Sequence, residues 1–351
     1  MAKLATLRVI RDIEPIPEAD LIVKAWVDGW SLVTQKTNFK VGDVALYMEV
    51  DTCIPVDHPA FAFLADRGVR TIEGVKYHKL KTIRLKKTLS QGLLIPLEAL
   101  EALGHTFRYD DFDKDYGEEL GMIRWDPEIH QGGARLAGNA LRSFPSNTIP
   151  KTDLERIQNN MSILQDDSTY EASMKLEGSS LTVYYNANDQ YDYGVCSKNL
   201  QLKLDDPVNT ENAFVKTAAK YELESKLRAY GKNIAIQFEL MGPGIQNNIE
   251  GFADYKLFAY RVWDIDAQRM LLPKDRRALI AQLGLDHVPI LDDNIKINAF
   301  TLDTILAYAD GPSIHAKLRE GVVFKSNTYD KWGGVTAVKV ISNKYLLKST
   351  D

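Results

Sequence analysis

Short apolar runs alternate with turn residues over the first hundred residues. Apolar residues flank Asp28-Gly29, a dipeptide that favours the positive φ values of a tight hairpin. Residues 44–50 form an apolar run with branched side chains, and residues 82–95 contain a further pair of strand-like runs. Short strands at this spacing predict a small closed barrel of the OB type over residues 1–105.

Charged residues, glycine and proline replace this pattern from residue 106, so we expect a linker over residues 106–149. Strand-like runs return after Pro150 and alternate with helical periodicity at residues 211–229 and 274–283. The chain is therefore predicted to be an α+β protein, with a second domain over residues 150–351.

Composition places the chain among globular proteins, with 45% hydrophobic and 26% charged residues. It contains neither an apolar run long enough to span a membrane nor the apolar core of a signal peptide, which predicts a cytoplasmic protein. Cys53 and Cys196 are too few and too distant for a disulfide framework or a zinc site, and we expect free thiols in a monomer.

The net charge of −5 argues against indiscriminate nucleic-acid binding, because such affinity comes from many lysines and arginines that neutralise phosphates. A local basic segment is still present. Its members are Lys76, His78, Lys79, Lys81, Arg84, Lys86 and Lys87. This segment is either a clamp for a nucleic-acid backbone or only the solvated face of a strand.

A lysine followed closely by a glutamate and a glycine begins the most informative series in the chain. Lys175-Leu176-Glu177-Gly178 alone is more typical of an exposed strand end followed by a turn. Five further blocks follow it in order. They are Ser197-Lys198-Asn199, Gln237-Phe238-Glu239-Leu240-Met241-Gly242, Phe258-Ala259-Tyr260-Arg261-Val262-Trp263-Asp264-Ile265, Glu320-Gly321-Val322-Val323-Phe324-Lys325 and Ala337-Val338-Lys339-Val340-Ile341.

This series resembles the nucleotidyltransferase motifs that RNA ligases, DNA ligases and mRNA capping enzymes share. The Naegleria-type RNA ligases resemble it most, since they carry an extra barrel before the catalytic domain. The resemblance covers about residues 150–351 and implies an ATP-grasp-like ligase domain of antiparallel sheets with flanking helices. It also implies ATP and a divalent metal, Mg or Mn, as cofactors, and RNA as the partner.

Lys175 is the candidate nucleophile in this resemblance. A lysine amine must be neutral to attack the α-phosphorus of ATP, so it needs positive charge nearby to lower its pKa. The pentavalent phosphorus accumulates negative charge, and Lys339 is the cation expected to stabilise it. Many RNA ligases have a second lysine two residues after the one at Lys339. Here Ile341 stands at that position, so either one lysine suffices or Lys325 or Lys344 replaces the second.

Carboxylates are needed because a divalent metal prefers hard oxygen ligands and the ribose offers hydroxyl donors. By resemblance, Glu177 contacts the ribose, Glu239 supports the sugar and the metal, and Glu320 is the main metal-linked carboxylate. Trp263 is expected to stack on one face of the adenine, and Val322 to cover the other.

Three further residues are assigned to nucleotide binding by resemblance. Lys198 stands where related ligases often have arginine, which keeps the charge but loses bidentate phosphate geometry. Arg156 and Gln158 are expected near the nucleotide, although a capped surface helix from Thr152 or Asp153 explains this segment equally well.

The predicted function is an ATP-dependent RNA ligase of RNA repair, which joins a 3′-hydroxyl to a 5′-phosphate through lysyl-AMP and RNA-adenylate. Arg84, Lys86 and Lys87 on the barrel are the expected RNA contacts. The alternatives are a DNA ligase or capping-type enzyme with the same chemistry, and a non-catalytic relative that only binds RNA.

Overall fold

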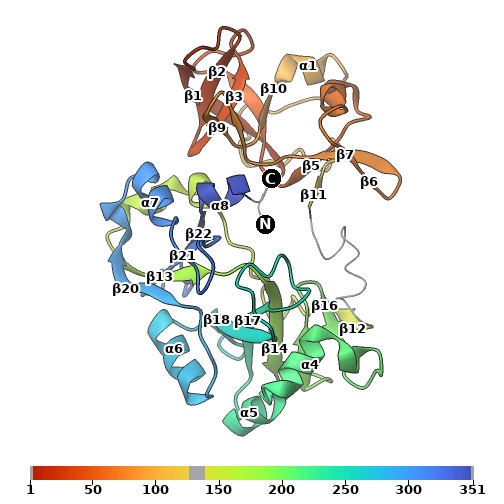
Figure 1. Cartoon of the computed structure of the whole chain (residues 1–351), viewed down its shortest axis with the longest axis vertical. Coiled ribbons are helices and arrows are strands. Elements are labelled where there is room, and N and C mark those ends of the chain that lie inside the picture. Colours follow the sequence, from red (N-terminus) through yellow and green to blue (C-terminus); the bar gives the residue numbers. More distant parts are fainter. Residues whose placement is uncertain (1–2, 126–138, 349–351) are drawn as a thin grey trace. The chain divides into compact units, whose positions relative to one another are not determined.

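The computed structural model describes residues 3–125 and 139–348, and these form two compact units (Figure 1). The first unit comprises Met1–His130, Ile157–Met161 and Leu346–Asp351, and the second comprises Gln131–Arg156 and Ser162–Tyr345. In the described residues no helix has the length and apolar character needed to cross a membrane.

An antiparallel five-stranded sheet forms the expected OB-type barrel, in the order β10-β4-β1-β2-β3. Its strands are β1 (Ala5–Pro15), β2 (Ile22–Val27), β3 (Trp30–Gln35), β4 (Val44–Met48) and β10 (Leu93–Pro96). Strands β2 and β3 are joined at the predicted Asp28-Gly29 turn, where Asp28 has a φ of 49°. The apolar residues of the alternating pattern, such as Leu7 and Trp30, are buried.

A second sheet and a hairpin complete the first unit. The sheet has the order β11-β5-β7-β6, and the hairpin pairs β8 with β9. These elements are β5 (Thr52–Pro55), β6 (Arg70–Ile72), β7 (Val75–Lys79), β8 (Ile83–Leu85), β9 (Thr88–Ser90), α1 (Leu97–Glu101) and β11 (Ile123–Arg124).

The first unit extends beyond residue 105, where the sequence predicted its end. Tyr116, Leu120 and Met122 belong to the same buried cluster as Leu7, and β11 pairs with β5. The charged composition concealed these apolar positions because they are widely spaced. Residues 126–138 of the expected linker lie outside the described residues.

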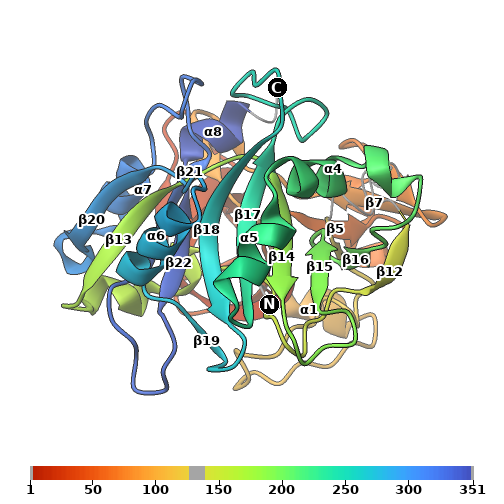
Figure 2. The same cartoon turned by 90° about the horizontal axis from the view of Figure 1, so that it is seen from below.

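The second unit is built on an antiparallel seven-stranded sheet in the order β12-β16-β15-β14-β17-β18-β19. Its strands are β12 (Ala140–Ser143), β14 (Ser179–Tyr185), β15 (Tyr193–Cys196), β16 (Leu200–Leu202), β17 (Ile234–Met241), β18 (Lys256–Asp264) and β19 (Arg269–Met270). Helices α4 (Ala213–Lys220) and α5 (Leu223–Tyr230) cover one face (Figure 2), where Phe214 and Leu227 pack on Leu181 and Phe238.

A four-stranded antiparallel sheet, β20-β13-β21-β22, completes the second unit. The remaining strands and helices are β13 (Thr169–Lys175), α6 (Pro273–Gln282), β20 (Ile290–Lys296), α7 (Leu302–Tyr308), β21 (Gly321–Ser326), β22 (Ala337–Ile341) and α8 (Asn343–Lys348). Short 3-10 helices lie at Pro59–Leu64, Ile157–Asn159, Met161–Gln165, Asn209–Glu211 and Ile297–Ala299.

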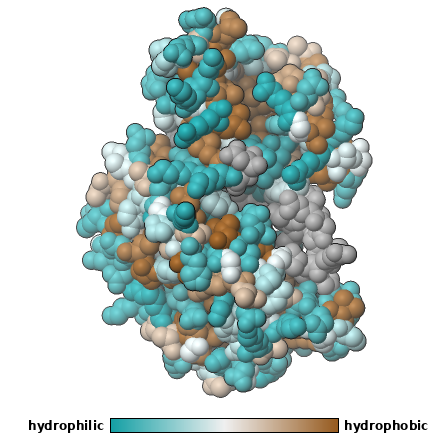
Figure 3. All heavy atoms as spheres, viewed as in Figure 1, coloured by the Kyte–Doolittle hydropathy of each residue, from teal (hydrophilic) through white to brown (hydrophobic). Residues whose placement is uncertain are grey.

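Local signals explain where the helices begin. The side chain of Asn212 caps α4 by accepting a hydrogen bond from the amide of Phe214, and Pro273 occupies the first turn of α6. The predicted helical stretch over residues 211–229 is interrupted at Glu222, which has a φ of 54°, so it forms two short helices. In the view of Figure 3, small groups of hydrophobic residues alternate with hydrophilic ones over both units.

Candidate active site

A cavity of about 390 Å³ in the second unit is lined by residues from each of the six sequence motifs. This volume lies within the range of small-molecule sites. The cavity is lined by Lys151, Thr152, Asp153, Leu154, Ser173, Met174, Lys175, Leu176, Ser180, Lys198, Glu239, Tyr260, Arg261, Met270, Val288, Val323, Lys325, Val335, Ala337 and Lys339. Both sheets of the unit contribute, since Glu239 and Tyr260 lie on the larger one and Lys175 and Lys339 on the smaller.

Strand register decides which motif residues face this cavity. Val323 on β21 is paired with Ser173 on β13 and with Lys339 on β22, and all three line the cavity. The alternate residues Val322 and Val338 are completely buried on the opposite face of the sheet. This is the two-residue periodicity of a strand that has one polar, open face and one core face.

Two motif glycines allow the backbones around the site to approach closely. A Cβ atom at Gly178 would lie 2.5 Å from the carbonyl oxygen of Leu240, and one at Gly321 would lie 2.2 Å from that of Val340. Neither distance is compatible with a side chain. These glycines therefore bring the Lys175 and Glu320 segments against their neighbouring strands.

Lys175 and Glu320 form the central ion pair of the site. The Lys175 Nζ lies 2.6 Å from a carboxylate oxygen of Glu320. Burial alone lowers the pKa of Lys175, but the carboxylates of Glu320 and Glu239 outweigh it, and the pKa is raised above its usual value. Burial, together with the negative charge of Glu320, raises the pKa of Glu239 to about 7. In this state of the site the Lys175 amine therefore carries a proton.

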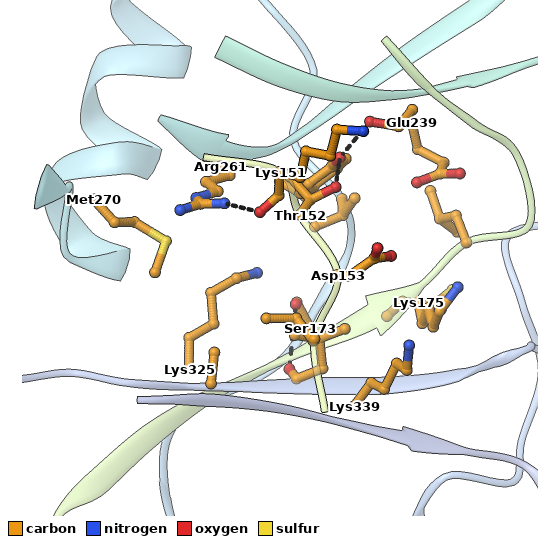
Figure 4. Close-up of a pocket in the computed structure, with 18 of the residues that line it drawn as sticks. Lys151, Thr152, Asp153, Ser173, Lys175, Glu239, Arg261, Met270, Lys325 and Lys339 are labelled. Carbon is orange, nitrogen blue, oxygen red and sulfur yellow. Dashed lines mark hydrogen bonds between the residues drawn. The ribbon is translucent and has the colours of Figure 1, made fainter. Parts of the chain in front are cut away.

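Lys339 lies beside Lys175 at the same end of the cavity (Figure 4). Burial, with the neighbouring charges of Arg156 and Lys175, lowers the pKa of Lys339 to about 8. The backbone amide of Lys339 donates to the carbonyl of Glu155 at 2.9 Å, and Arg156 and Lys339 form a parallel β-bridge. The segment that contains Glu155 and Arg156 thus pairs with β22.

Arg261, Met270 and Lys325 lie at the other end of the cavity (Figure 4). Lys325 is only 4% exposed, and burial, with the charge of Arg276, lowers its pKa to about 7. Arg276 and Arg277 both pair with the fully buried carboxylate of Glu171, whose charge also acts on Lys325. The hydroxyl of Tyr260 is held by Ser180 at 2.9 Å and Thr152 at 3.3 Å, which fixes its ring at the cavity wall.

Comparisons with known proteins agree with this arrangement. An OB-fold domain model matches residues 4–97, and an RNA ligase model matches residues 168–341. The solved structure of Naegleria gruberi RNA ligase with PPi is 36% identical, with 100% of both chains covered and a TM-score of 0.88. The chain belongs to the RNA ligase family. A mutant of the Naegleria enzyme solved with ATP and Mn is 35% identical, with 100% of both chains covered and a TM-score of 0.88.

A mutant of the same Naegleria RNA ligase without ligand is 36% identical to this chain. The alignment covers 99% of this chain and 98% of the other, with a TM-score of 0.88. No curated protein matched the sequence. The similarity to the Naegleria ligase therefore spans both units of this RNA ligase family member.

Within this RNA ligase fold, five of the residues predicted from the motifs lie together. Four of them line the cavity, namely Lys175, Lys198, Glu239 and Lys339. The fifth, Glu320, forms an ion pair with Lys175. Glu177 is buried beside them and accepts a hydrogen bond from the side-chain amide of Asn247 at 2.6 Å. Burial raises the pKa of Glu177, and this effect exceeds the lowering of the pKa by the hydrogen bonds from Asn247 and Tyr345.

Trp263 does not reach the cavity, contrary to the sequence-based expectation. It is not a lining residue but packs with Phe144 and Ile149, and the Cζ of the lining residue Arg261 lies 5.4 Å from its ring centroid. Its indole nitrogen donates to the carbonyl of Thr148 at 3.0 Å. Tyr260 occupies the cavity instead, because the pairing of β18 with β17 shifts register at this point.

Val322 does not line the cavity either, contrary to the sequence-based expectation. Its side chain is completely buried in the core face of the small sheet, and Val323 lines the cavity. Of the candidates for a second motif lysine, Lys325 lines the cavity, whereas Lys344 pairs with Asp310 at 3.0 Å and is not in the lining.

The two upstream residues predicted near the nucleotide are both absent from the cavity lining. Arg156 is bridged to Lys339 and affects the site through its charge. Gln158 is buried in the first unit, where its backbone contacts Gly29. The amide of Gly29 donates to the carbonyl of Gln158 at 3.3 Å, so this residue supports the barrel.

Several lining residues were not singled out from the sequence, namely Lys151, Asp153, Ser180, Tyr260, Arg261 and Val323. Tyr260, Arg261 and Val323 belong to motif blocks that the sequence did identify, but their facing depends on register. Lys151 and Asp153 precede the first motif, in the segment that β22 holds in place.

The predicted RNA contacts lie on the β8–β9 hairpin of the first unit. Lys86 and Lys87 form its two-residue turn, with φ values of 47° and 63°, and Arg84 lies on β8. All three are exposed, and no ion pair is recorded for them among the described residues. Their charges are therefore available to an anion.

Proposed function

We propose that this chain is an ATP-dependent RNA ligase that joins a 3′-hydroxyl to a 5′-phosphate and serves in RNA repair. The observation that carries the proposal is the Lys175 amine in a nucleotide-sized cavity, paired with Glu320 and beside Lys339. Membership of the RNA ligase family and similarity to a ligase solved with ATP and Mn support it.

The reaction has three transfers at phosphorus. The neutral Lys175 amine attacks the α-phosphorus of ATP, an N–P bond forms, and pyrophosphate leaves. An oxygen of the RNA 5′-phosphate then attacks the same phosphorus, which releases Lys175 and gives RNA-adenylate. Finally the RNA 3′-hydroxyl attacks the 5′-phosphorus, AMP leaves, and the phosphodiester is complete. Lys339 is placed to stabilise the negative charge that develops in the first two transfers.

The carboxylates fit a divalent metal because their oxygens are hard ligands. No cluster of three or more His, Cys, Asp or Glu side chains with metal-site geometry occurs within residues 3–125 and 139–348. Glu320 and Glu239 are the residues that would hold the metal, which would supply a Lewis acid beside the phosphates of ATP. Bound there, Mg or Mn would offset the charges that keep Lys175 protonated and would place positive charge beside the α-phosphate.

Two lining residues are suited to hold the adenine. Tyr260 lines the cavity from the large sheet and Val323 from the small one. An aromatic ring and an aliphatic side chain are the kinds of surface that cover a flat base. We assign the stacking role to Tyr260 and the covering role to Val323, while Glu177 remains the proposed ribose contact.

Incubation with ATP labelled at the α-phosphate and a divalent metal, followed by a denaturing gel, tests the proposal. Label is expected on the wild-type chain and not on Lys175→Met, which removes the amine but roughly keeps the volume. The control is Lys216→Met, since Lys216 is an exposed lysine paired with Glu211. Persistence of label on Lys175→Met contradicts the assignment.

Substrate strands then separate the ligase classes. Sealing of RNA 3′-hydroxyl ends, with little sealing of DNA ends, is the expected result. Preference for DNA identifies a DNA ligase, transfer of a nucleotide to a 5′-diphosphate end identifies a capping-type enzyme, and RNA binding without any covalent AMP identifies a non-catalytic relative.

A further inference from the structure

Trp332 is an unusually exposed aromatic residue in the second unit. Its side chain is 84% exposed, although an indole is among the largest apolar surfaces that a protein can bury. It lies in the loop of residues 327–336, which joins β21 to β22. Its indole surface is therefore open to a ligand.

The exposure of Trp332 is fixed by its loop. The Asp330 carboxylate accepts hydrogen bonds from the backbone amides of Trp332 and Gly334, both at 2.8 Å. The Asp330 amide in turn donates to the carbonyl of Gly334 at 2.8 Å. The Tyr329 hydroxyl donates to the carbonyl of Met270 at 3.1 Å, which fastens the loop to β19. These bonds order the backbone that carries the indole, which reduces the ordering needed when a ligand binds.

Positive charge accompanies the aromatic rings of this loop. The Lys331 Nζ lies 5.1 Å from the Trp332 ring centroid, and the Arg269 Cζ lies 5.1 Å from that of Tyr329. Both cations are exposed, and the described part of the chain provides no ion-pair partner for either of them. They are therefore available to phosphate groups of a ligand.

The loop leads directly from the adenylation cavity. Lys325 before the loop and Val335 after it line the cavity, as does Met270, to which Tyr329 is bonded. Figure 4 shows Met270 and Lys325 at the end of the cavity away from Lys175. The loop therefore adjoins the end of the cavity away from Lys175.

We propose that Trp332, with Lys331 and Arg269, binds a single-stranded segment of the RNA substrate by stacking one base on the indole. An aromatic ring beside free cations is the combination that single-stranded nucleic acids recognise. A protein partner is less suited, because the neighbours Thr328, Asp330, Lys331 and Gly334 are exposed and provide no apolar surround. The proposal deepens the proposed function, since it rests on RNA being the substrate.

Binding of a short single-stranded RNA is the direct test, with ATP left out so that catalysis does not contribute. Trp332→Ala should weaken binding about five- to a hundredfold, the range for loss of one base stack. Trp332→Phe should retain most of the affinity because it keeps a ring. The matched control is Val208→Ala, which truncates another exposed apolar side chain of the same unit, 64% exposed.

A second measurement separates this role from nucleotide handling. Self-adenylation should be unchanged in Trp332→Ala, and sealing of a pre-adenylated RNA strand below saturation should fall in proportion to the affinity. Wild-type affinity in Trp332→Ala, or an equal loss in Val208→Ala, overturns the proposal. A loss of self-adenylation together with RNA binding also overturns it. If wild-type protein forms no covalent AMP, the proposed function fails, while the binding comparison still decides the role of Trp332.

Discussion

The Glu320 carboxylate lies 2.6 Å from the Lys175 amine and holds a proton on the group proposed to act as the nucleophile. The pKa of Lys175 is raised, so its amine becomes neutral only at a pH above the usual range for lysine. This relationship predicts that ATP-free, metal-free protein has an unreactive Lys175 at neutral pH.

Glu320→Gln should therefore lower the pH at which Lys175 becomes reactive, because it removes the nearest negative charge. The measurement is modification of Lys175 by an amine-directed reagent across a pH series, followed by mass spectrometry, with neither ATP nor metal present. Glu211→Gln is the control, since Glu211 pairs with Lys216 in an exposed position. If the pH midpoint of Lys175 modification is the same in wild type and Glu320→Gln, the ion pair between Lys175 and Glu320 does not set the pKa of Lys175.

Tyr260 and Trp263 should give opposite results when each is replaced by alanine. Tyr260→Ala should raise the ATP concentration needed for self-adenylation about tenfold, as expected when a stacking ring is lost. Tyr260→Phe keeps the ring, so it should stay close to wild type. Self-adenylation is measured as a function of ATP concentration, and a larger effect in Trp263→Ala than in Tyr260→Ala would reverse the assignment.

Trp263→Ala should instead reduce the free energy of unfolding by about 3 kcal/mol, since it removes a packed ring and leaves a cavity beside Phe144 and Ile149. In the Trp263→Ala protein that remains folded, the ATP concentration needed for self-adenylation should change little. Urea unfolding provides the measurement. An unchanged unfolding midpoint would mean that this ring contributes nothing to the core.

Lys325 should make stability depend on pH above neutrality. Its pKa is about 7 in the folded chain and about 10.5 when unfolded, so between these values the unfolded state binds one more proton. Stability from this group then rises by about 1.4 kcal/mol per pH unit above pH 7. Lys325→Met should lose that slope, measured by urea unfolding at pH 7, 8 and 9. Parallel curves for the two proteins would contradict the depressed pKa.

The β8–β9 hairpin should contribute to RNA sealing and not to self-adenylation. Lys86 and Lys87 have positive φ values, so alanine there would add backbone strain. Arg84→Ala, Lys86→Asn and Lys87→Gly together remove the charges with residues that suit this turn. We expect less sealing and a weaker dependence of sealing on salt.

The control for the hairpin variant removes the same number of charges elsewhere on the barrel, at the exposed residues Lys36, Lys40 and Arg67. Self-adenylation and RNA sealing are each measured across a salt series for wild type, the hairpin variant and the control. If the hairpin variant and the control seal RNA equally well, the basic hairpin is only a solvated surface.

The architecture of the chain and the chemical groups of its candidate site were predictable from residue types and their order. The Asp28-Gly29 turn and the alternating strands predicted the barrel, and the order of motif blocks predicted the ligase domain and placed Lys175, Lys339, Glu239 and Glu320 in one site. Residue type carries this information, because turn propensity and acid–base chemistry are local properties.

Strand register in the folded chain, which the sequence pattern does not specify, sets which residues of each motif face the cavity. A one-residue difference in register exchanges the two faces of a strand, so Val323 and not Val322 lines the cavity. The irregular pairing of β18 likewise brings Tyr260 to the cavity, whereas Trp263 packs with Phe144 and Ile149. The pKa values of Lys175, Lys325 and Lys339 follow from burial and from charges distant in sequence, which no local pattern specifies.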